Sequence, residues 1–239
     1  MTPQRLAVPK TYKLYIGGKF PRSESGRTYE VVSAKGAFLA NASLASRKDA
    51  RDAVVAARAA LAGWSGATAY NRGQVLYRIA ELLEGRREQF VDELVATEGA
   101  SRAVATRQVD TAIDAWVWYA GWADKYVQAA GNGNPVSGPY FNLSTPEPTG
   151  VVAIIAPQSA GSLLGLVSVI APAILSGNTV VVVASQSAPL SAVSLGEVLA
   201  TSDVPGGVVN ILTGSPAEMG PWLAGHADVN AIDLAGAGD

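Results

Sequence analysis

Apolar residues in the second half of the chain gather in short, unbroken runs that alternate with segments of helical periodicity. The predicted elements from residue 151 onward are strand 151–156, helix 162–175, strand 179–184, helix 192–200, strand 208–212, helix 216–225 and strand 231–234. Strands that are apolar along their whole length, each followed by a helix, are typical of a parallel sheet with both faces covered. We therefore expect an α/β fold with a doubly wound, Rossmann-like parallel sheet over residues 151–239.

Residues 1–135 show a different pattern, in which an early turn is followed by helices. The run Lys13–Phe20 is apolar but broken by a Gly-Gly pair, which is typical of a hairpin. Ser46 is a predicted helix N-cap, because Asp49 stands at the third helical position of an acidic capping box. The spacing of apolar residues predicts strand 29–33 and helices 50–63, 71–85, 90–99 and 103–130.

Aromatic residues crowd the second half of the helix predicted over 103–130. They are Trp116, Trp118, Tyr119, Trp122 and Tyr126. Large aromatic side chains most often fill a core or an interface, so we interpret this cluster as packing rather than as a platform for a ligand.

The segment between the helices and the sheet is rich in turn-forming residues. Gly131–Pro135 is a predicted linker by composition. Gly138–Thr145 alternates loosely between apolar and polar positions and is a predicted strand that ends before Pro146.

Composition and charge narrow the class of protein. The chain has 239 residues, 49% of them hydrophobic, and a formal net charge of −2 with both signs mixed along its length. Because it has no basic stripe and no polybasic amphipathic segment, we expect no nucleic-acid partner and no membrane partner. The N-terminus has no apolar signal core, and the longest apolar stretch, 160–175, is too short to cross a bilayer. We therefore expect a cytoplasmic protein.

Few residues of the chain are suited to catalysis or to metal binding. The sequence contains no cysteine, which excludes a disulfide scaffold, a zinc-thiolate site and a cysteine nucleophile. His226 is the single histidine, with Asp228 as its one nearby carboxylate, and we interpret it as a surface or helix-end residue. No serine lies in a nucleophile elbow, and no group of carboxylates has the spacing of a calcium loop. The sequence therefore predicts no catalytic residue and no metal site.

Several runs of residues share their order and spacing with a known family. They are Leu14-Tyr-Ile-Gly-Gly-Lys-Phe20, Glu147-Pro-Thr-Gly-Val-Val, Ser176-Gly-Asn-Thr-Val-Val-Val-Val183 and Pro205-Gly-Gly-Val-Val-Asn-Ile-Leu-Thr-Gly214. The chain resembles the N-terminal, cofactor-binding half of the aldehyde dehydrogenases, as a shortened and degenerate member. The resemblance implies a single cofactor-binding domain over 1–239, without the family's catalytic domain. Its parts would be an N-terminal hairpin and helices in 1–135, an oligomerisation strand in 136–150 and Rossmann-like βα units in 151–239.

The departures from the family fall on positions that the resemblance assigns to the cofactor or the substrate. Ser159 stands where the family has an asparagine that helps to hold the oxyanion. Val183 and Gln186 replace a lysine and a glutamate that contact the adenosine ribose. Ala237 replaces a serine that meets the pyrophosphate. The vestigial cofactor-binding positions are Pro157, Gln158, Ser159, Val183, Gln186, Gly214, Gly236 and Ala237.

The missing thiol decides which function we expect. Members of the family attack the aldehyde with a cysteine thiolate, which this chain does not carry. We expect a catalytically inactive structural or regulatory subunit without a cofactor, which assembles with itself or with a full-length aldehyde dehydrogenase relative. We expect this assembly because an unpaired strand edge can pair with another chain and an uncovered apolar surface is stabilised by burial.

Two alternatives keep a role for a nucleotide. The first is a fragment or subunit of a working NAD(P)-dependent aldehyde dehydrogenase, an oxidoreductase whose thiol lies on another segment or chain. The second is a nucleotide-binding module without chemistry, which would use the N-termini of the helices that follow the strands.

Overall fold

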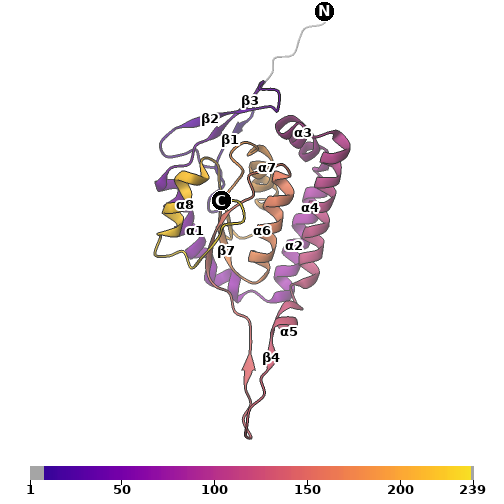
Figure 1. Ribbon diagram of the computed structural model, residues 1–239, viewed down its shortest axis with the longest axis vertical. Coiled ribbons are helices and arrows are strands. Elements are labelled where there is room, and N and C mark those ends of the chain that lie inside the picture. The colour runs from indigo at the N-terminus through magenta and orange to yellow at the C-terminus, as the bar shows by residue number, and fades with distance from the viewer. Residues whose placement is uncertain (1–7, 238–239) are drawn as a thin grey trace, which may run out of the picture.

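A parallel sheet of four strands runs through the middle of the molecule (Figure 1). The structure is a computed structural model and describes residues 8–237, so the two ends of the predicted 1–239 domain lie outside the described residues. The strands are β6 (Val151–Ile155), β7 (Thr179–Val183), β8 (Val209–Leu212) and β9 (Ala231–Asp233). Their order is β8-β7-β6-β9, and every neighbouring pair is parallel. The predicted α/β, doubly wound sheet is confirmed.

Helices cover both faces of this sheet. Along β7, Val180 and Val182 pack toward one face, whereas Val181 and Val183 pack toward the other. All five residues of β7 are buried, which explains the unbroken apolar run in the sequence. The helices on the first face are α6 (Ser162–Leu175) and α7 (Leu190–Leu199), and those on the second face are α1 (Arg47–Gly66) and α8 (Pro216–Ala224).

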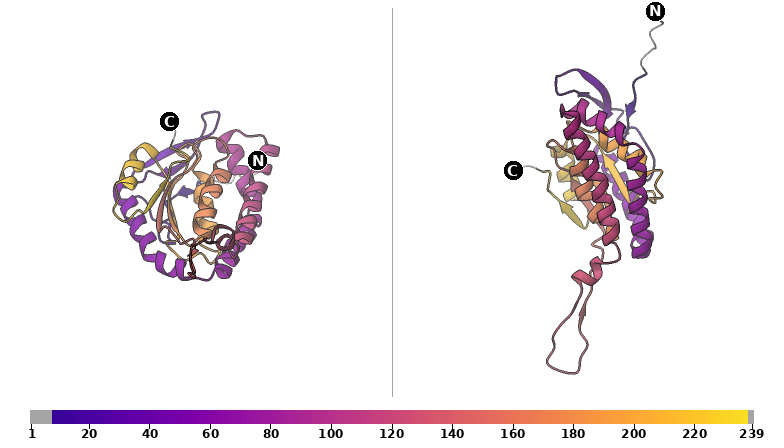
Figure 2. Two further views of the ribbon diagram at one scale, coloured as in Figure 1. Left: turned by 60° about the horizontal axis from the view of Figure 1, so that its bottom comes forward. Right: turned by 90° about the vertical axis from the view of Figure 1, so that its right-hand side faces the viewer.

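A further layer of helices packs on the outer side of α6 (Figure 2). It consists of α2 (Ala69–Glu84), α3 (Arg87–Glu98) and α4 (Arg102–Trp122). Trp64 Nε1 donates to the carbonyl oxygen of Ile174 at 2.8 Å, and Arg72 Nε donates to that of Leu175 at 3.0 Å. These bonds satisfy carbonyl groups at the end of α6 that have no partner within the helix.

Two of the predicted helix ends are wrong. The capping box of Ser46 and Asp49 is confirmed, but α1 continues past Gly63 to Gly66, because the buried Trp64 holds the last turn against α6. The helix predicted over 103–130 is two helices, because α4 ends at Trp122 and α5 (Tyr126–Ala130) begins after a turn.

The aromatic cluster at this turn is mostly packing. Trp116 is fully buried, and Tyr119, Trp122 and Tyr126 pack half-buried against the same core. Trp118 is the exception, since it is exposed and contacts the edge of Tyr119.

The N-terminal segment forms a small sheet beyond one end of the large one (Figure 1). Its strands are β1 (Thr11–Tyr12), β2 (Thr28–Val32) and β3 (Phe38–Ser43), in the order β1-β3-β2. The expected turn within 13–20 is present, with Ile16 and Lys19 exchanging backbone hydrogen bonds. Its second glycine, Gly18, has a φ of 76° and lies so close to the backbone of Gly206 that a side chain has no room. Two loops far apart in the sequence are therefore in direct backbone contact.

A two-stranded hairpin extends from the body as an arm (Figures 1 and 2). Its strands β4 (Asn132–Gly133) and β5 (Leu143–Ser144) are antiparallel. The linker predicted over Gly131–Pro135 is therefore wrong, because this segment is one side of the arm, and the boundary expected at residue 136 falls inside it. The strand predicted over 138–145 shrinks to Leu143–Ser144. The Asn134 amide, which donates to Ser144 Oγ at 2.9 Å, ties the two sides together.

Among residues 8–237, no helix is both long enough and apolar enough to cross a membrane.

Candidate functional site

The loops that follow β6, β7 and β9 meet at the carboxyl edge of the sheet. The chain leaves β6 toward β7 on one side and returns as β9 on the other, which makes this edge a topological switch point, where ligands bind in open α/β sheets. Seven of the eight predicted positions lie at this edge, which we call the crevice: Pro157, Gln158, Ser159, Val183, Gln186, Gly236 and Ala237. Gly214 follows the outer strand β8 and instead packs against Leu44 and Ala45.

The side chain of Gln158 joins the first two loops. Its Nε2 donates to the carbonyl oxygen of Ala156 at 2.6 Å, and its Oε1 accepts from the backbone N–H of Gln186 at 2.9 Å. The amide is thus used for internal bonds, and the exposed side chain of Gln186 lies at the rim. Gln158 therefore connects the loop after β6 to the loop after β7.

Glu98 occupies the start of α6, at the opposite side of the same loop. Its Oε2 accepts from the backbone N–H of Gly161 at 2.8 Å, and its Oε1 accepts from the N–H and Oγ of Ser162 at 2.9 and 2.7 Å. A helix N-terminus attracts an anion because its free N–H groups and its dipole point outward. Here that anion is the chain's own Glu98 carboxylate, and its partner Gly161 follows Ser159 by two residues.

The sequence analysis missed Glu98. It lies at the end of α3, directly before Gly99, which caps that helix in the left-handed conformation with a φ of 67°. Its position in the sequence indicates a solvated helix end, and its partners are 63 and 64 residues away. No local pattern predicts the pairing.

Val183 offers no polar group to the crevice. It is fully buried at the end of β7 and belongs to the apolar cluster on the α1 and α8 face of the sheet. Ser159 is exposed in the loop after β6. The position expected to meet a ribose is therefore aliphatic, and the position expected to hold an oxyanion carries only a hydroxyl.

The loop after β9 crosses the carboxyl end of β6. Gly236 N–H donates to the carbonyl oxygen of Ile155 at 2.9 Å, and its Cα lies against Ala156 with no room for a side chain. Behind this loop lies a cavity of about 340 Å³, lined by Ile155, Pro216, Ala217, Gly220, Pro221, Ala224, Ile232, Leu234 and Ala237.

A dinucleotide fits this cavity in part. Every lining side chain is apolar, so a flat ring would find apolar contacts here. The ribose and the diphosphate would find no side-chain donor among the lining residues, and Glu98 already occupies the start of α6. The residues present therefore do not fit a complete dinucleotide.

His226 takes no part in this crevice. It follows α8 and precedes β9, which places it at the amino edge of the sheet. Its Nδ1 accepts from the backbone N–H of Asp228 at 3.1 Å. Within residues 8–237, no group of three or more histidine or carboxylate side chains is arranged to hold a metal ion.

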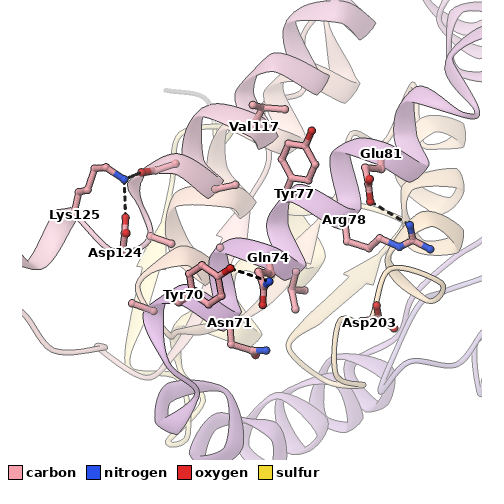
Figure 3. A pocket seen from close by; sticks show the side chains of 16 residues that line it. Tyr70, Asn71, Gln74, Tyr77, Arg78, Glu81, Val117, Asp124, Lys125 and Asp203 are labelled. Atoms are coloured by element: carbon pink, nitrogen blue, oxygen red, sulfur yellow. Dashed lines mark hydrogen bonds and ion pairs between the residues drawn. The ribbon is translucent and has the colours of Figure 1, made fainter.

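A larger groove lies elsewhere, between α2 and α4 (Figure 3). It has a volume of about 850 Å³, and Tyr70 and Tyr77 stand on its wall, with Tyr70 69% exposed. The close approach of the helices at its floor depends on Gly73, where a Cβ would lie 3.0 Å from the carbonyl oxygen of Ala120. Four of its five charged side chains are paired, since Arg78 contacts Glu81 at 3.1 Å and Lys125 contacts Asp124 at 2.7 Å, and Asp203 is the fifth. The groove is thus an aromatic, nearly neutral surface.

Comparison with known proteins agrees with the resemblance. The family model "Aldehyde dehydrogenase family" matches residues 20–239. A cytosolic 10-formyltetrahydrofolate dehydrogenase from Mus musculus is 34% identical over 239 residues, which cover 98% of this chain and 26% of that protein. A 2-hydroxymuconic semialdehyde dehydrogenase from Pseudomonas sp. (strain CF600) is 34% identical, with 95% of this chain and 48% of that protein covered.

The solved structures show the same relationship. An aldehyde dehydrogenase from Bacillus cereus, determined as an NAD+ complex, superposes with a TM-score of 0.88 at 28% identity, covering 93% of this chain and 45% of that one. The chain therefore spans between a quarter and about half of the length of the relatives it matches. With a family model that covers nearly all of its residues and a fold shared at this level, the chain belongs to the aldehyde dehydrogenase family.

Proposed function

We propose that this chain is a non-catalytic member of its family and acts as a structural or regulatory subunit. The observation that carries the proposal is the crevice, where Gln158 and Glu98 are engaged in hydrogen bonds within a chain that has no thiol. The N–H groups of Gly161 and Ser162, which follow Ser159 in the same loop, are bonded to the Glu98 carboxylate and are not free to hold an oxyanion. The site therefore offers these donors to its own carboxylate and not to the charge that aldehyde oxidation develops.

No cofactor is part of this proposal. The B. cereus relative was determined with NAD+, which shows what that protein binds. In this chain, Val183 is aliphatic and Gln158 is engaged in internal bonds. Each lost hydrogen bond costs binding free energy on the order of 1 kcal/mol, so we expect NAD(P) affinity no tighter than about millimolar.

The arm supports association with another chain. A two-stranded hairpin is marginally stable by itself, yet this one carries Tyr140 and Phe141 at 76% and 89% exposure. The aromatic groove of Figure 3 ends near the base of the arm, at Asp124 and Lys125. We propose that these two surfaces are covered in an assembly with a second copy or with a full-length relative.

The first test measures catalysis. Purified chain is incubated with NAD+ or NADP+ and a panel of aldehydes, and NAD(P)H is followed by absorbance, with a full-length relative as the positive control. We expect no rate above that of boiled protein. Turnover by the isolated chain would refute the proposal.

The alternative of a fragment or subunit of a working dehydrogenase rests on the coverage, since the chain spans under half of the relatives named above. It is tested by co-expression with a full-length relative. Aldehyde oxidation that exceeds the relative's own rate in the purified complex would favour this alternative over a structural role. An unchanged or reduced rate in the complex supports a structural or regulatory subunit.

The apolar cavity beside α8 favours the second alternative, a nucleotide-binding module. Calorimetry with NAD+, ADP-ribose and adenosine separates the possibilities. Weak binding of all three supports the proposal. A micromolar dissociation constant for any of them would favour the module.

A further inference from the structure

A second groove lies between the start of α1 and the end of α8, which are neighbours on the same face of the sheet (Figure 1). Its volume is about 620 Å³. The buried side chains of Ala50 and Leu223 form an apolar part of its lining, and Trp222 adds an aromatic wall that is 43% exposed. Grooves that bind small molecules combine such an apolar lining with a few polar groups.

Three basic side chains lie among the polar groups of this groove, together with Glu24, Ser46 and His226. Arg47, Lys48 and Arg51 project from the first turns of α1, and Glu24 is the single carboxylate of the lining. Lys48 contacts Glu24 at 3.5 Å, so neither arginine has a carboxylate partner within the lining, although Arg51 pairs with Asp52 outside it. The chain as a whole carries a net charge of −2, so this concentration of positive charge is a local feature.

Arg47 is held in place without an ion pair. Its guanidinium carbon lies 3.9 Å from the centre of the Trp222 ring. Among residues 8–237 no carboxylate forms a salt bridge with it, whereas Arg51 contacts Asp52 outside the groove at 2.9 Å. A stacked guanidinium keeps its N–H groups free at the edge of its plane, where they can hold a phosphate or carboxylate through two parallel bonds.

The N-terminus of α1 itself is already capped. Ser46 Oγ accepts from Asp49 N–H, and Asp49 Oδ2 accepts from Ser46 N–H at 2.8 Å. The binding capacity of the groove therefore resides in its side chains and not in the helix terminus.

We propose that this groove binds a small organic anion that carries a flat ring. The ring packs on Leu223 and Ala50 beside Trp222, and the anionic group lies between Arg47 and Arg51. The proposal is independent of catalysis, because the groove contains none of the predicted cofactor-binding positions and shares only Pro221 with the cavity behind the loop after β9.

The test uses phenyl phosphate as the probe, with the full chain at low ionic strength and calorimetry as the measurement. Inorganic phosphate supplies the charge without the ring, and phenol supplies the ring without the charge. We expect phenyl phosphate to bind at least about tenfold more tightly than either, and its affinity to fall as salt is added. Absence of phenyl phosphate binding, or equal affinity for inorganic phosphate, would overturn the proposal.

Variants locate the site. We expect the double change Arg47→Ala and Arg51→Ala to weaken phenyl phosphate binding about tenfold or more, because charge-assisted bidentate bonds are lost. Arg78→Ala is the matched control, since Arg78 is an exposed arginine in the groove between α2 and α4. Circular dichroism checks that each variant is folded. Unchanged affinity in the folded double variant, or an equal loss in Arg78→Ala, would place the binding elsewhere.

Discussion

The crevice at the carboxyl edge of the sheet and the arm at the other end of the molecule differ in whether their side chains have partners within the chain. In the crevice, the Gln158 amide and the Glu98 carboxylate, which could face a ligand, each bond to backbone groups of the chain. On the arm, Tyr140 and Phe141 are exposed although both would gain by burial. The polar side chains of the crevice have hydrogen-bond partners within the chain, whereas the aromatic side chains of the arm are exposed to solvent.

This difference indicates where the molecule meets its surroundings. Groups that are already bonded gain little from a ligand, because each new bond must replace an existing one. Exposed aromatic side chains gain the full free energy of leaving water. The comparison therefore favours association through the arm over chemistry in the crevice.

The largest expected effect is on the arm. The double change Tyr140→Ser and Phe141→Ser removes the aromatic surface, and we expect the oligomer to dissociate because buried aromatic anchors contribute on the order of 2 kcal/mol or more each to an interface. Light scattering at micromolar concentration measures the mass. Phe38→Ser, a change at another exposed phenylalanine, is the control and should leave the mass unchanged. A wild-type chain that is already monomeric would contradict the proposal that the arm mediates association.

The next effect concerns Glu98. Glu98→Ala leaves the N–H groups of Gly161 and Ser162 without their acceptor, and we expect the free energy of unfolding to fall by about 1–3 kcal/mol. Urea denaturation measures it, and Glu98→Gln, which keeps one acceptor oxygen, should lose less. Glu88→Ala is the control, because Glu88 is exposed on the same helix. If Glu98→Ala matched Glu88→Ala, the crevice would not depend on its internal anion.

A second carboxylate on α3 provides a contrast with Glu98. Glu93 is buried against α7, where its Oε1 accepts from Ser194 Oγ at 2.6 Å and from Gln89 Nε2 at 3.2 Å. Its Oε2 is buried and, within the described part of the chain, has no hydrogen-bond partner. Burial raises the pKa of Glu93 above its ordinary value of 4.5, and the hydrogen bonds from Ser194 and Gln89 oppose this only in part.

The raised pKa predicts a pH dependence of stability. A carboxyl whose pKa is higher in the folded state binds its proton more tightly there, so its stabilising contribution is complete below pH 4.5 and is lost as the pH rises through the raised pKa. We expect Glu93→Gln to remove this loss, so that its unfolding free energy relative to wild type increases with pH above 4.5. Urea denaturation from pH 4 to pH 8 measures the difference. Parallel curves for both proteins would contradict the assignment to Glu93.

The smallest expected effect is at Gln186. Gln186→Glu restores the acidic residue that the family resemblance implies at this position, but we expect NAD+ affinity to change less than about twofold, because one restored contact does not replace the buried aliphatic side chain of Val183 beside it. Calorimetry measures the affinity. A shift to micromolar binding would show that the crevice is closer to a working site than its internal bonds indicate.

The sequence predicted the sheet well because periodicity and burial agree there. A strand with five buried residues, such as β7, can be read directly as an apolar run. β3 was missed, since it carries Ala40, Asn41 and Ala42 rather than β-branched residues, and its burial depends on the neighbouring β1 and β2. The predictions for the arm were partly wrong because its strand pairing also depends on contacts with another segment. Asn134 makes these contacts across the hairpin.

The sequence indicates that the candidate positions follow the ends of predicted strands, but it does not indicate which side chains are engaged in bonds within the chain. Seven of the predicted positions lie at one edge of the sheet, as expected from parallel strands whose carboxyl ends coincide. The occupation of α6 by Glu98 could not be predicted, because it joins residues on different helices through the fold alone. Spacing in a sequence indicates which residues can meet a ligand, and it does not indicate which of them are already engaged.

The contact between the Gly17–Gly18 turn and the loop at Gly206 has a consequence for synthesis on the ribosome. Gly17 N–H donates to the side chain of Asn210, 193 residues away, and Tyr15 bonds to Ile211 beside it. A nascent chain therefore emerges with Leu14 and Tyr15 exposed and has to keep them from aggregating until most of the described sequence has been translated. Two early buried residues of the described chain are therefore among the last to find their partners.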